Sequence, residues 1–123
     1  MSRILRFSEM YHQHDYDVSM DLTETVAADV LVMPVTHAYV AKTTGDDAEA
    51  LTLANGKPGQ VLVINLVTDG GGSGTLTPAT CTGFSTILFA DAGDQAVLFY
   101  VDDVVGWIIL SVFGLTAQPT VAA

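Results

Sequence analysis

The chain has 123 residues, which fits one domain and leaves too little length for a second hydrophobic core. Half of the residues are apolar and only 15% are charged, against roughly 25% charged in an ordinary soluble domain. This composition excludes a disordered chain and argues against a multidomain enzyme. It also indicates more apolar surface than one small core can bury, so we expect more than a lone monomer.

The charge balance is strongly acidic, with 14 acidic residues against 4 basic ones, a formal net charge of −10 and a sequence pI of about 4.2. Such a surface repels phosphate backbones, so we expect no nucleic-acid partner. Two of the four basic residues, Arg3 and Arg6, lie close to the N-terminus. An acidic body therefore follows a short basic arm.

Cys81 is the single cysteine, which excludes an intrachain disulfide and a cysteine-rich zinc site. The apolar stretch after Arg3 is interrupted too early for a signal peptide. The longest apolar run, Val104 to Leu110, is far shorter than the roughly 20 residues that a membrane-spanning helix requires. We therefore expect a soluble protein made in the cytoplasm, without a membrane partner.

The first third of the chain has the weakest pattern. Residues 1–29 predict an extended N-terminal arm, with one strand near Tyr16–Leu22. Residues 30–40 predict one or two strands interrupted at Pro34, which lacks an N–H and favours an edge or a bulge. Residues 46–50 fit either the start of a short helix, because acidic residues suit a helix N-terminus, or a polar loop.

From residue 51 onwards, β-branched and apolar runs alternate with turn-forming residues, and Val, Ile and Thr pack best on a pleated sheet. This spacing predicts a single all-β domain over residues 30–123, a small β-sandwich or jelly-roll-like barrel. The six predicted strands are Leu51–Leu53, Val61–Thr68, Thr75–Thr77, Thr86–Ala90, Ala96–Val101 and Trp107–Phe113.

Two of these strands lack the apolar–polar alternation of a half-exposed strand: residues 61–64 are Val-Leu-Val-Ile and residues 107–110 are Trp-Ile-Ile-Leu. Both of their faces need cover, and no helical segment is long enough to give it. Since burial of a Leu or Ile side chain contributes about 1.5–3 kcal/mol, leaving several exposed is unfavourable. Homo-oligomerisation supplies the missing cover.

One cluster carries residue types that bind metals. In an extended segment, His12 and His14 point to one side and Asp15 and Asp17 to the other, a pair that a transition metal could use with a third ligand. His37 is the only other histidine. Polar arms in acidic chains collect such residues without a metal, so we predict no metal and no cofactor.

The turns offer weaker candidates. Residues 69–74 are glycine-rich but lack the Lys-Ser/Thr ending and the following helix of a phosphate-binding loop, so they predict a flexible turn. Turn aspartates could bind calcium if their loops converge, although aspartate is also a common turn residue. These aspartates are Asp91, Asp94, Asp102 and Asp103.

Nucleophilic catalysis has little support. Cys81 with His37, or Ser73 between glycines, lacks the strand–turn–helix arrangement that exposes a nucleophile. No two carboxylates stand out as a glycosidase pair either. We therefore predict that the protein is not an enzyme, and that Cys81 is a small buried or loop residue.

Trp107, the only tryptophan, begins the most apolar strand. We predict that it is a core or subunit-interface anchor together with Phe99 and Ile109. The alternative is that Trp107 and Tyr100 stack on a sugar.

The order of short motifs over residues 51–114 resembles a β-rich module of tailed-bacteriophage structural proteins, which occurs in head decoration proteins, head fibres and tail fibres. The motifs are Leu-Thr-Leu-Ala-Asn-Gly at 51–56, Gly-Gln at 59–60, Gly-Thr-Leu-Thr-Pro at 74–78, Gly-Phe-Ser-Thr-Ile-Leu-Phe at 83–89, Gly-Asp at 93–94, Ala-Val-Leu-Phe-Tyr at 96–100 and Gly-Trp at 106–107.

This resemblance implies a homotrimeric, all-β virion component on the capsid surface, without catalytic residues. We expect a capsid decoration (cement) protein that binds the outer surface of the head and stabilises contacts between major capsid subunits, with Arg3 and Arg6 contacting the capsid. The alternatives are a carbohydrate-binding head-fibre or tail-fibre module and, less favoured, a small metal-dependent enzyme built on His12, His14 and Asp15.

Overall fold

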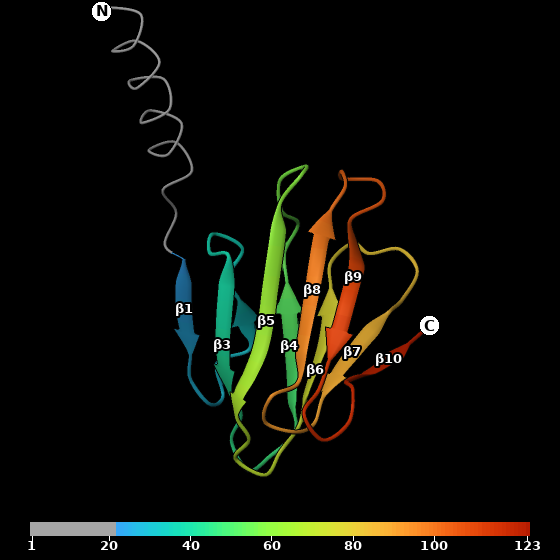
Figure 1. Ribbon diagram of the computed structural model, residues 1–123. Helices are drawn as coiled ribbons and strands as arrows, with labels where there is room; N and C mark the ends of the chain where they lie inside the picture. The colour runs from blue at the N-terminus through green and yellow to red at the C-terminus, as the bar shows by residue number, and fades with distance from the viewer. Residues whose placement is uncertain (1–21) are drawn as a thin grey trace, which may run out of the picture.

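The computed structural model describes residues 22–123, which form two five-stranded β-sheets packed face to face (Figure 1). The first sheet has the strand order β1-β3-β5-β8-β9, and the second has the order β10-β7-β6-β4-β2. The described residues contain no helix, so the prediction of a small all-β sandwich is confirmed. The strands are β1 (Thr23–Val26), β2 (Val32–Met33), β3 (Tyr39–Thr43), β4 (Glu49–Leu53), β5 (Val61–Thr68), β6 (Gly74–Pro78), β7 (Thr86–Phe89), β8 (Gln95–Tyr100), β9 (Trp107–Phe113) and β10 (Thr120–Ala122).

All six strands expected after residue 50 are present, and their bounds agree within two residues. The segment around Pro34 forms two strands, since β2 ends at Met33 and β3 begins at Tyr39. Residues 44–48 form a loop rather than a helix, and β4 starts directly after them.

The sheet begins earlier than the expected end of the arm at residue 29. Residues 23–26 form β1, which pairs in parallel with β3 at the edge of the first sheet. Only Val26 of this strand is buried. The sequence Thr-Glu-Thr-Val therefore lacks a clear alternation of apolar and polar residues, and the strand was not predicted. The metal-ligand cluster at residues 12–17, the arm residues Arg3 and Arg6, and most of the strand expected near Tyr16–Leu22 lie outside the described residues.

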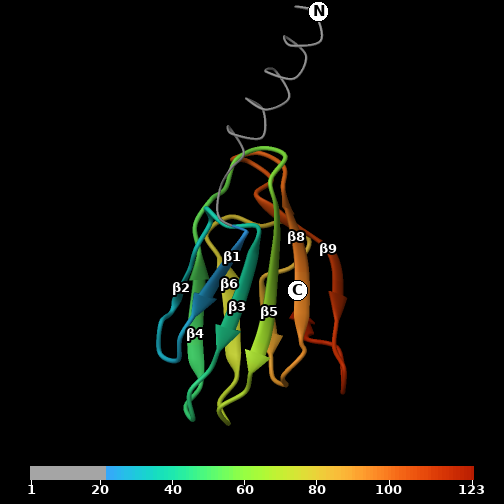
Figure 2. The same cartoon turned by 60° about the vertical axis from the view of Figure 1, so that its left-hand side comes forward.

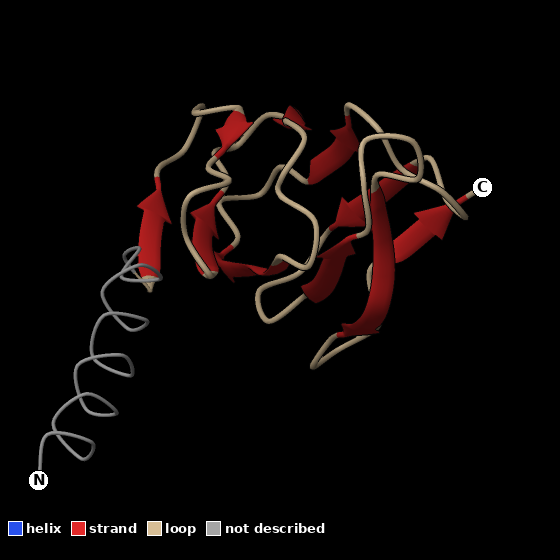
Figure 3. Ribbon diagram, turned by 90° about the horizontal axis from the view of Figure 1, so that it is seen from above, coloured by secondary structure: helices blue, strands red, loops and turns tan. Residues whose placement is uncertain are grey.

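The chain path explains why the strands pair as they do. From β1 to β6, successive strands alternate between the two sheets, so β1, β3 and β5 pair in parallel in the first sheet and β2, β4 and β6 do so in the second. Figure 2 and Figure 3 show this winding path from the side and along the strands. Each parallel connection passes through the opposite sheet instead of through a helix. The remaining strands pair antiparallel.

The core lies between the sheets and follows the period of two along each strand. On β5, for example, Leu62, Ile64 and Leu66 are buried, whereas Val61 and Val67 on the other face are 45% and 40% exposed. The same alternation in the other strands supplies the rest of the core, including Val40, Leu51, Leu76, Ile87, Phe89, Leu98, Tyr100 and Trp107.

One turn shows how local sequence sets the geometry. Residues 57–60 form a β-turn in which the Gln60 N–H donates to the Lys57 carbonyl at 2.9 Å. Pro58 occupies the second position and Gly59, with φ of +89°, the third, as a type II turn requires. The Gln60 side chain also accepts from the Lys57 N–H at 3.0 Å, which fixes the start of β5.

Candidate functional surface

Trp107 is fully buried and anchors the core between β9 and the β4–β5 loop. Its Nε1–H donates to the Ala54 carbonyl at 3.0 Å, and its ring meets that of Tyr100 edge-on, with centroids 5.1 Å apart. Both rings are inaccessible, so neither can stack on a sugar in this structure. Of the other two expected anchors, Ile109 packs against the core, whereas Phe99 is half-buried on the outward face of β8.

The carboxylates at the β8–β9 turn serve the turn itself. The Tyr100 hydroxyl donates to the Asp103 carboxylate, and Asp102 accepts from the N–H groups of Val104 and Val105 at 2.9 and 2.7 Å. Burial of the phenol, with the negative charge of Asp103 beside it, raises the pKa of Tyr100 to about 12.

The other candidate calcium ligands lie at the opposite end of the sandwich. Asp94 is buried and accepts from the N–H groups of Ala90 and Asp91 at 2.9 and 3.1 Å, closing the β7–β8 turn. The loops of the four turn aspartates therefore do not converge. Within residues 22–123, no group of three or more His, Cys, Asp or Glu side chains is placed to hold a metal ion.

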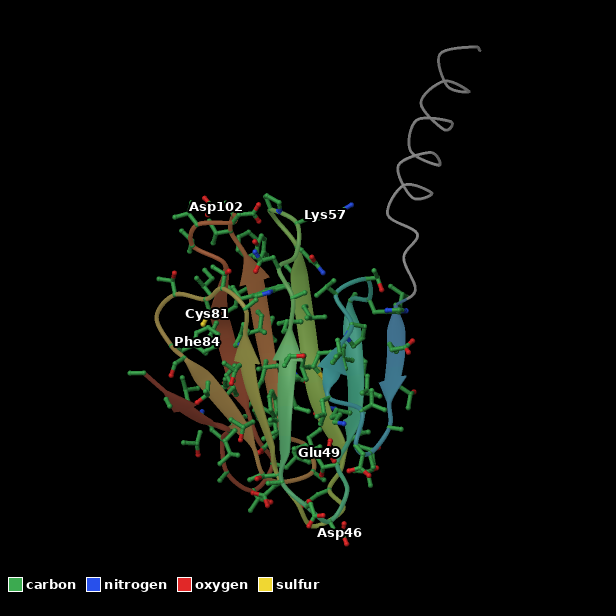
Figure 4. All side chains as sticks on the ribbon, turned by 180° about the vertical axis from the view of Figure 1, so that it is seen from behind. Asp46, Glu49, Lys57, Cys81, Phe84 and Asp102 are labelled. Carbon is green, nitrogen blue, oxygen red and sulfur yellow. The ribbon has the colours of Figure 1, made fainter. Side chains whose placement is uncertain are left out.

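Cys81 and His37 are engaged with different partners. Cys81, which lies beside Phe84 in Figure 4, is half-buried and its thiol donates to the Phe84 carbonyl at 3.1 Å, while burial raises the pKa of that thiol. His37 lies 3.5 Å from Glu24 and 3.1 Å from the Thr36 hydroxyl. The described contacts thus give no cysteine–histidine pair, and Cys81 is a half-buried loop residue.

The glycine-rich segment packs against a neighbouring loop. The Gly72 N–H donates to the Gly45 carbonyl at 2.8 Å. A Cβ atom at Gly70 or Gly72 would lie 2.2 Å from the Thr44 carbonyl or 2.0 Å from the Asp47 carbonyl. The glycines therefore permit close contact between the β3–β4 and β5–β6 loops, which is a structural role.

A buried ion pair joins the two sheets. Lys42 on β3 lies 2.7 Å from Glu49 on β4, and both side chains are almost fully buried. Lys42 also donates to the carbonyls of Ala27 and Val30, and Glu49 accepts from the N–H groups of Gly45 and Asp29. Burial alone would raise the pKa of Glu49, but these hydrogen bonds and the Lys42 charge outweigh it, so the pKa lies below its ordinary value.

An open cavity of about 680 Å³ lies between the β2–β3 loop and the β4–β5 loop. Lys57 lines it and is the one exposed lysine or arginine among residues 22–123, since Lys42 is buried. The remaining lining comes from Val35, Thr36, Asn55, Gly56, Pro58, Gly59, Gln60 and Val61.

Charge is concentrated at the ends of the sandwich. The end formed by the β1–β2, β3–β4, β5–β6, β7–β8 and β9–β10 connections, at the bottom of Figure 1, carries most of the acidic side chains of residues 22–123. Its exposed or half-exposed carboxylates are Asp29, Asp46, Asp47, Asp69 and Asp91. Two copies of this end would repel one another.

By contrast, the outward face of the first sheet carries no charged side chain, and much of it is apolar. On all five strands, the burial pattern and the strand register place only apolar or uncharged polar residues on this face. They are Thr23, Thr25, Tyr39, Ala41, Thr43, Val61, Val63, Asn65, Val67, Gln95, Val97, Phe99, Ile108, Ser111 and Phe113. The sequence predicted this uncovered face from the missing alternation at residues 61–64 and 107–110.

No helix among the described residues has the length and apolar character needed to cross a membrane. Comparison of the chain with models of known protein families gives no match, and comparison with curated protein sequences gives no significant match.

Proposed function

We propose that the protein is a homotrimeric capsid decoration (cement) protein of a tailed bacteriophage, which binds the outer surface of the head and reinforces contacts between major capsid subunits. The uncharged outward face of the first sheet is the main support. In a chain with a net charge of −10, a sheet face without charges is suited to burial against protein rather than to exposure.

Such a function requires buried interface area between proteins and no catalytic or metal-binding residues. A protein–protein interface of standard size buries about 1,600 Å², and its repetition over a shell adds up to a large stabilisation of the coat. The carboxylates of Asp94, Asp102 and Asp103, the Cys81 thiol and the Trp107 indole all have structural partners, which fits a rigid module that acts through its surface.

The acidic ends of the sandwich make its attachment to another acidic surface unfavourable, and the basic arm offers an alternative. In this proposal Arg3 and Arg6 reach a capsid surface of negative charge, and the uncharged outward face of the first sheet, rather than an acidic end, packs against the coat. The arm contact is electrostatic, so binding to capsids weakens as the salt concentration rises.

The experiment is co-sedimentation of the purified protein with empty capsids of its phage. We expect saturable binding, and we expect capsids with bound protein to withstand higher temperature before they release DNA or disassemble. Arg3→Ala with Arg6→Ala reduces capsid binding, whereas Lys57→Ala, which removes an exposed cation outside the arm, serves as the matched control. Absence of binding by the intact protein would refute the proposal.

A further inference from the structure

The sandwich has two open sides, where the edge strands of both sheets lie next to each other. The N-terminal side consists of Leu22, β1, the β1–β2 loop and β2, and the C-terminal side consists of β9, residues 114–119 and β10. Figure 1 shows β1 at one edge of the molecule and β9 and β10 at the other. Each side presents backbone N–H and C=O groups that no strand of residues 22–123 pairs, a surface that soluble proteins usually protect.

Most of the large apolar side chains exposed in this structure lie on these two sides. On the C-terminal side they are Leu110, Phe113, Leu115 and Val121. On the N-terminal side they are Leu22, Val30, Leu31 and Val32. Leu110 is 54% exposed, and it is the extra residue of a bulge in β9, because the register shifts between Val97 and Leu98.

Charge distinguishes the two sides. The final 20 residues of the chain, from Val104 onwards, contain no Asp, Glu, Lys or Arg, although the whole chain has 18 such residues. The C-terminal side can therefore meet a second acidic copy without repulsion between like charges. The N-terminal side carries Glu24 and Asp29, so contact between two N-terminal sides would place these carboxylates near their counterparts.

Strand direction favours contact between unlike sides. The observed pairings make β9 run parallel to β1 and β10 run parallel to β2. When the next copy has its strands in the same direction, its N-terminal side meets the C-terminal side of the first copy. Each sheet of the first copy then continues into the corresponding sheet of the next, with β1 beside β9 and β2 beside β10. A contact between two C-terminal sides would leave Leu22, Val30, Leu31 and Val32 uncovered in every copy.

We infer that the C-terminal side of one copy packs against the N-terminal side of the next, so that the protein assembles head to tail. Repetition of such a contact closes into a ring when the rotation between copies allows it. This inference builds on the self-association in the proposed function and specifies its interface, which includes Leu110 and Phe113 but not the buried Trp107.

The test uses the full chain and two single substitutions, Leu110→Glu on the C-terminal side and Val32→Glu on the N-terminal side. Both positions are more than half exposed, so the fold can accept the change, and circular dichroism with Trp107 fluorescence checks it. Val104→Glu adds the same charge at an 86% exposed position in the β8–β9 connection, which belongs to neither side as defined above. Light scattering after size exclusion gives the mass of each species.

We expect an oligomer for the wild type and for Val104→Glu, and a 13.0 kDa monomer for each interface variant. Mixing the two variants restores one intact contact and gives a species of twice the chain mass, which cannot grow because its outer sides carry the substitutions. A monomeric wild type, an oligomeric Val32→Glu variant or a mixture that stays monomeric would each overturn the inference. Capsid binding by the wild type remains a separate measurement, so the two proposals can fail independently.

Discussion

Lys42 and Glu49 form an ion pair between the two sheets, with Nζ and Oε1 2.7 Å apart and both side chains nearly inaccessible to water. The two residues also hold the β1–β2 and β3–β4 loops through four hydrogen bonds to backbone groups. Since desolvation offsets much of the attraction in a buried pair, the consequence of this arrangement is best measured by removing one partner.

Substitution Lys42→Met leaves the Glu49 carboxylate buried without its counter-charge, and removal of one partner of such a pair costs about 3–5 kcal/mol. We expect the free energy of unfolding in urea to fall by that amount. Lys57→Met is the control at an exposed lysine and changes it by no more than about 0.5 kcal/mol. In the double variant Lys42→Met/Glu49→Gln the loss is smaller than for Lys42→Met alone; a loss equal to the sum of the two single-variant losses would show that the two side chains act independently.

The pKa of Glu49 predicts a loss of stability in acid. A carboxyl group whose pKa is lower in the folded state stabilises that state above its unfolded pKa, and the contribution is lost as the pH falls towards the lowered folded value. The difference in unfolding free energy between wild type and Glu49→Gln should thus be constant at neutral pH and shrink below about pH 5. A difference that does not change with pH would contradict this assignment.

The raised pKa of Tyr100 predicts a loss of stability at alkaline pH, whereas the lowered pKa of Glu49 predicts one in acid. Its pKa is raised to about 12 from an ordinary value near 10, so its contribution to stability is complete below pH 10 and is lost as the pH rises to 12. A spectrophotometric titration of the folded protein should therefore show a late tyrosine ionisation step near pH 12. Tyr100→Phe should remove this late step, and its persistence would show that another tyrosine is responsible.

Trp107 and Phe99 are predicted to differ in what they stabilise. Trp107→Ala empties a buried site and should lower the free energy of unfolding by about 3–5 kcal/mol at every protein concentration. Phe99 is half-buried on the uncharged outward face of β8, so Phe99→Ala should lower the free energy of unfolding less than Trp107→Ala and should chiefly weaken capsid binding. Urea unfolding and co-sedimentation with capsids separate the two effects, and a Trp107→Ala loss that depends on protein concentration would place Trp107 at an interface between copies instead.

Cys81 is expected to react slowly with thiol reagents, because burial raises its pKa and its thiol donates to the Phe84 carbonyl. The rate of modification at pH 8 should increase strongly when urea unfolds the protein. A rate that is equal in the folded and unfolded protein would mean that the loop at residues 81–84 opens readily.

The all-β class and six strands could be predicted because long apolar runs such as residues 61–68 end at turn-forming residues, which restrict both the type and the bounds of an element. The short strands β1 and β10 could not, since Val26 is the only buried residue of β1 and β10 has none. Parallel pairing was missed because the choice of sheet for each successive strand depends on contacts between strands far apart in the chain.

The candidate site residues show the same division between what could and what could not be predicted. The size of Trp107 and its position at the start of an apolar strand were enough to predict a buried anchor. The Lys42–Glu49 pair gave no sequence pattern, although Lys42 follows Val40 by two residues and so shares its inward face. The uncovered face of the first sheet was predicted from missing alternation, but the two open sides required the strand order.

The winding path of β1 to β6 also sets an order of construction during synthesis. Each parallel strand pairs with the strand made two elements earlier, so the first six strands can assemble as they leave the ribosome. Both sheets then wait for their last two strands, which are β8 and β9 in the first sheet and β7 and β10 in the second. The uncharged C-terminal side is therefore completed last, and a nascent chain does not present it to neighbouring copies until its own core has formed.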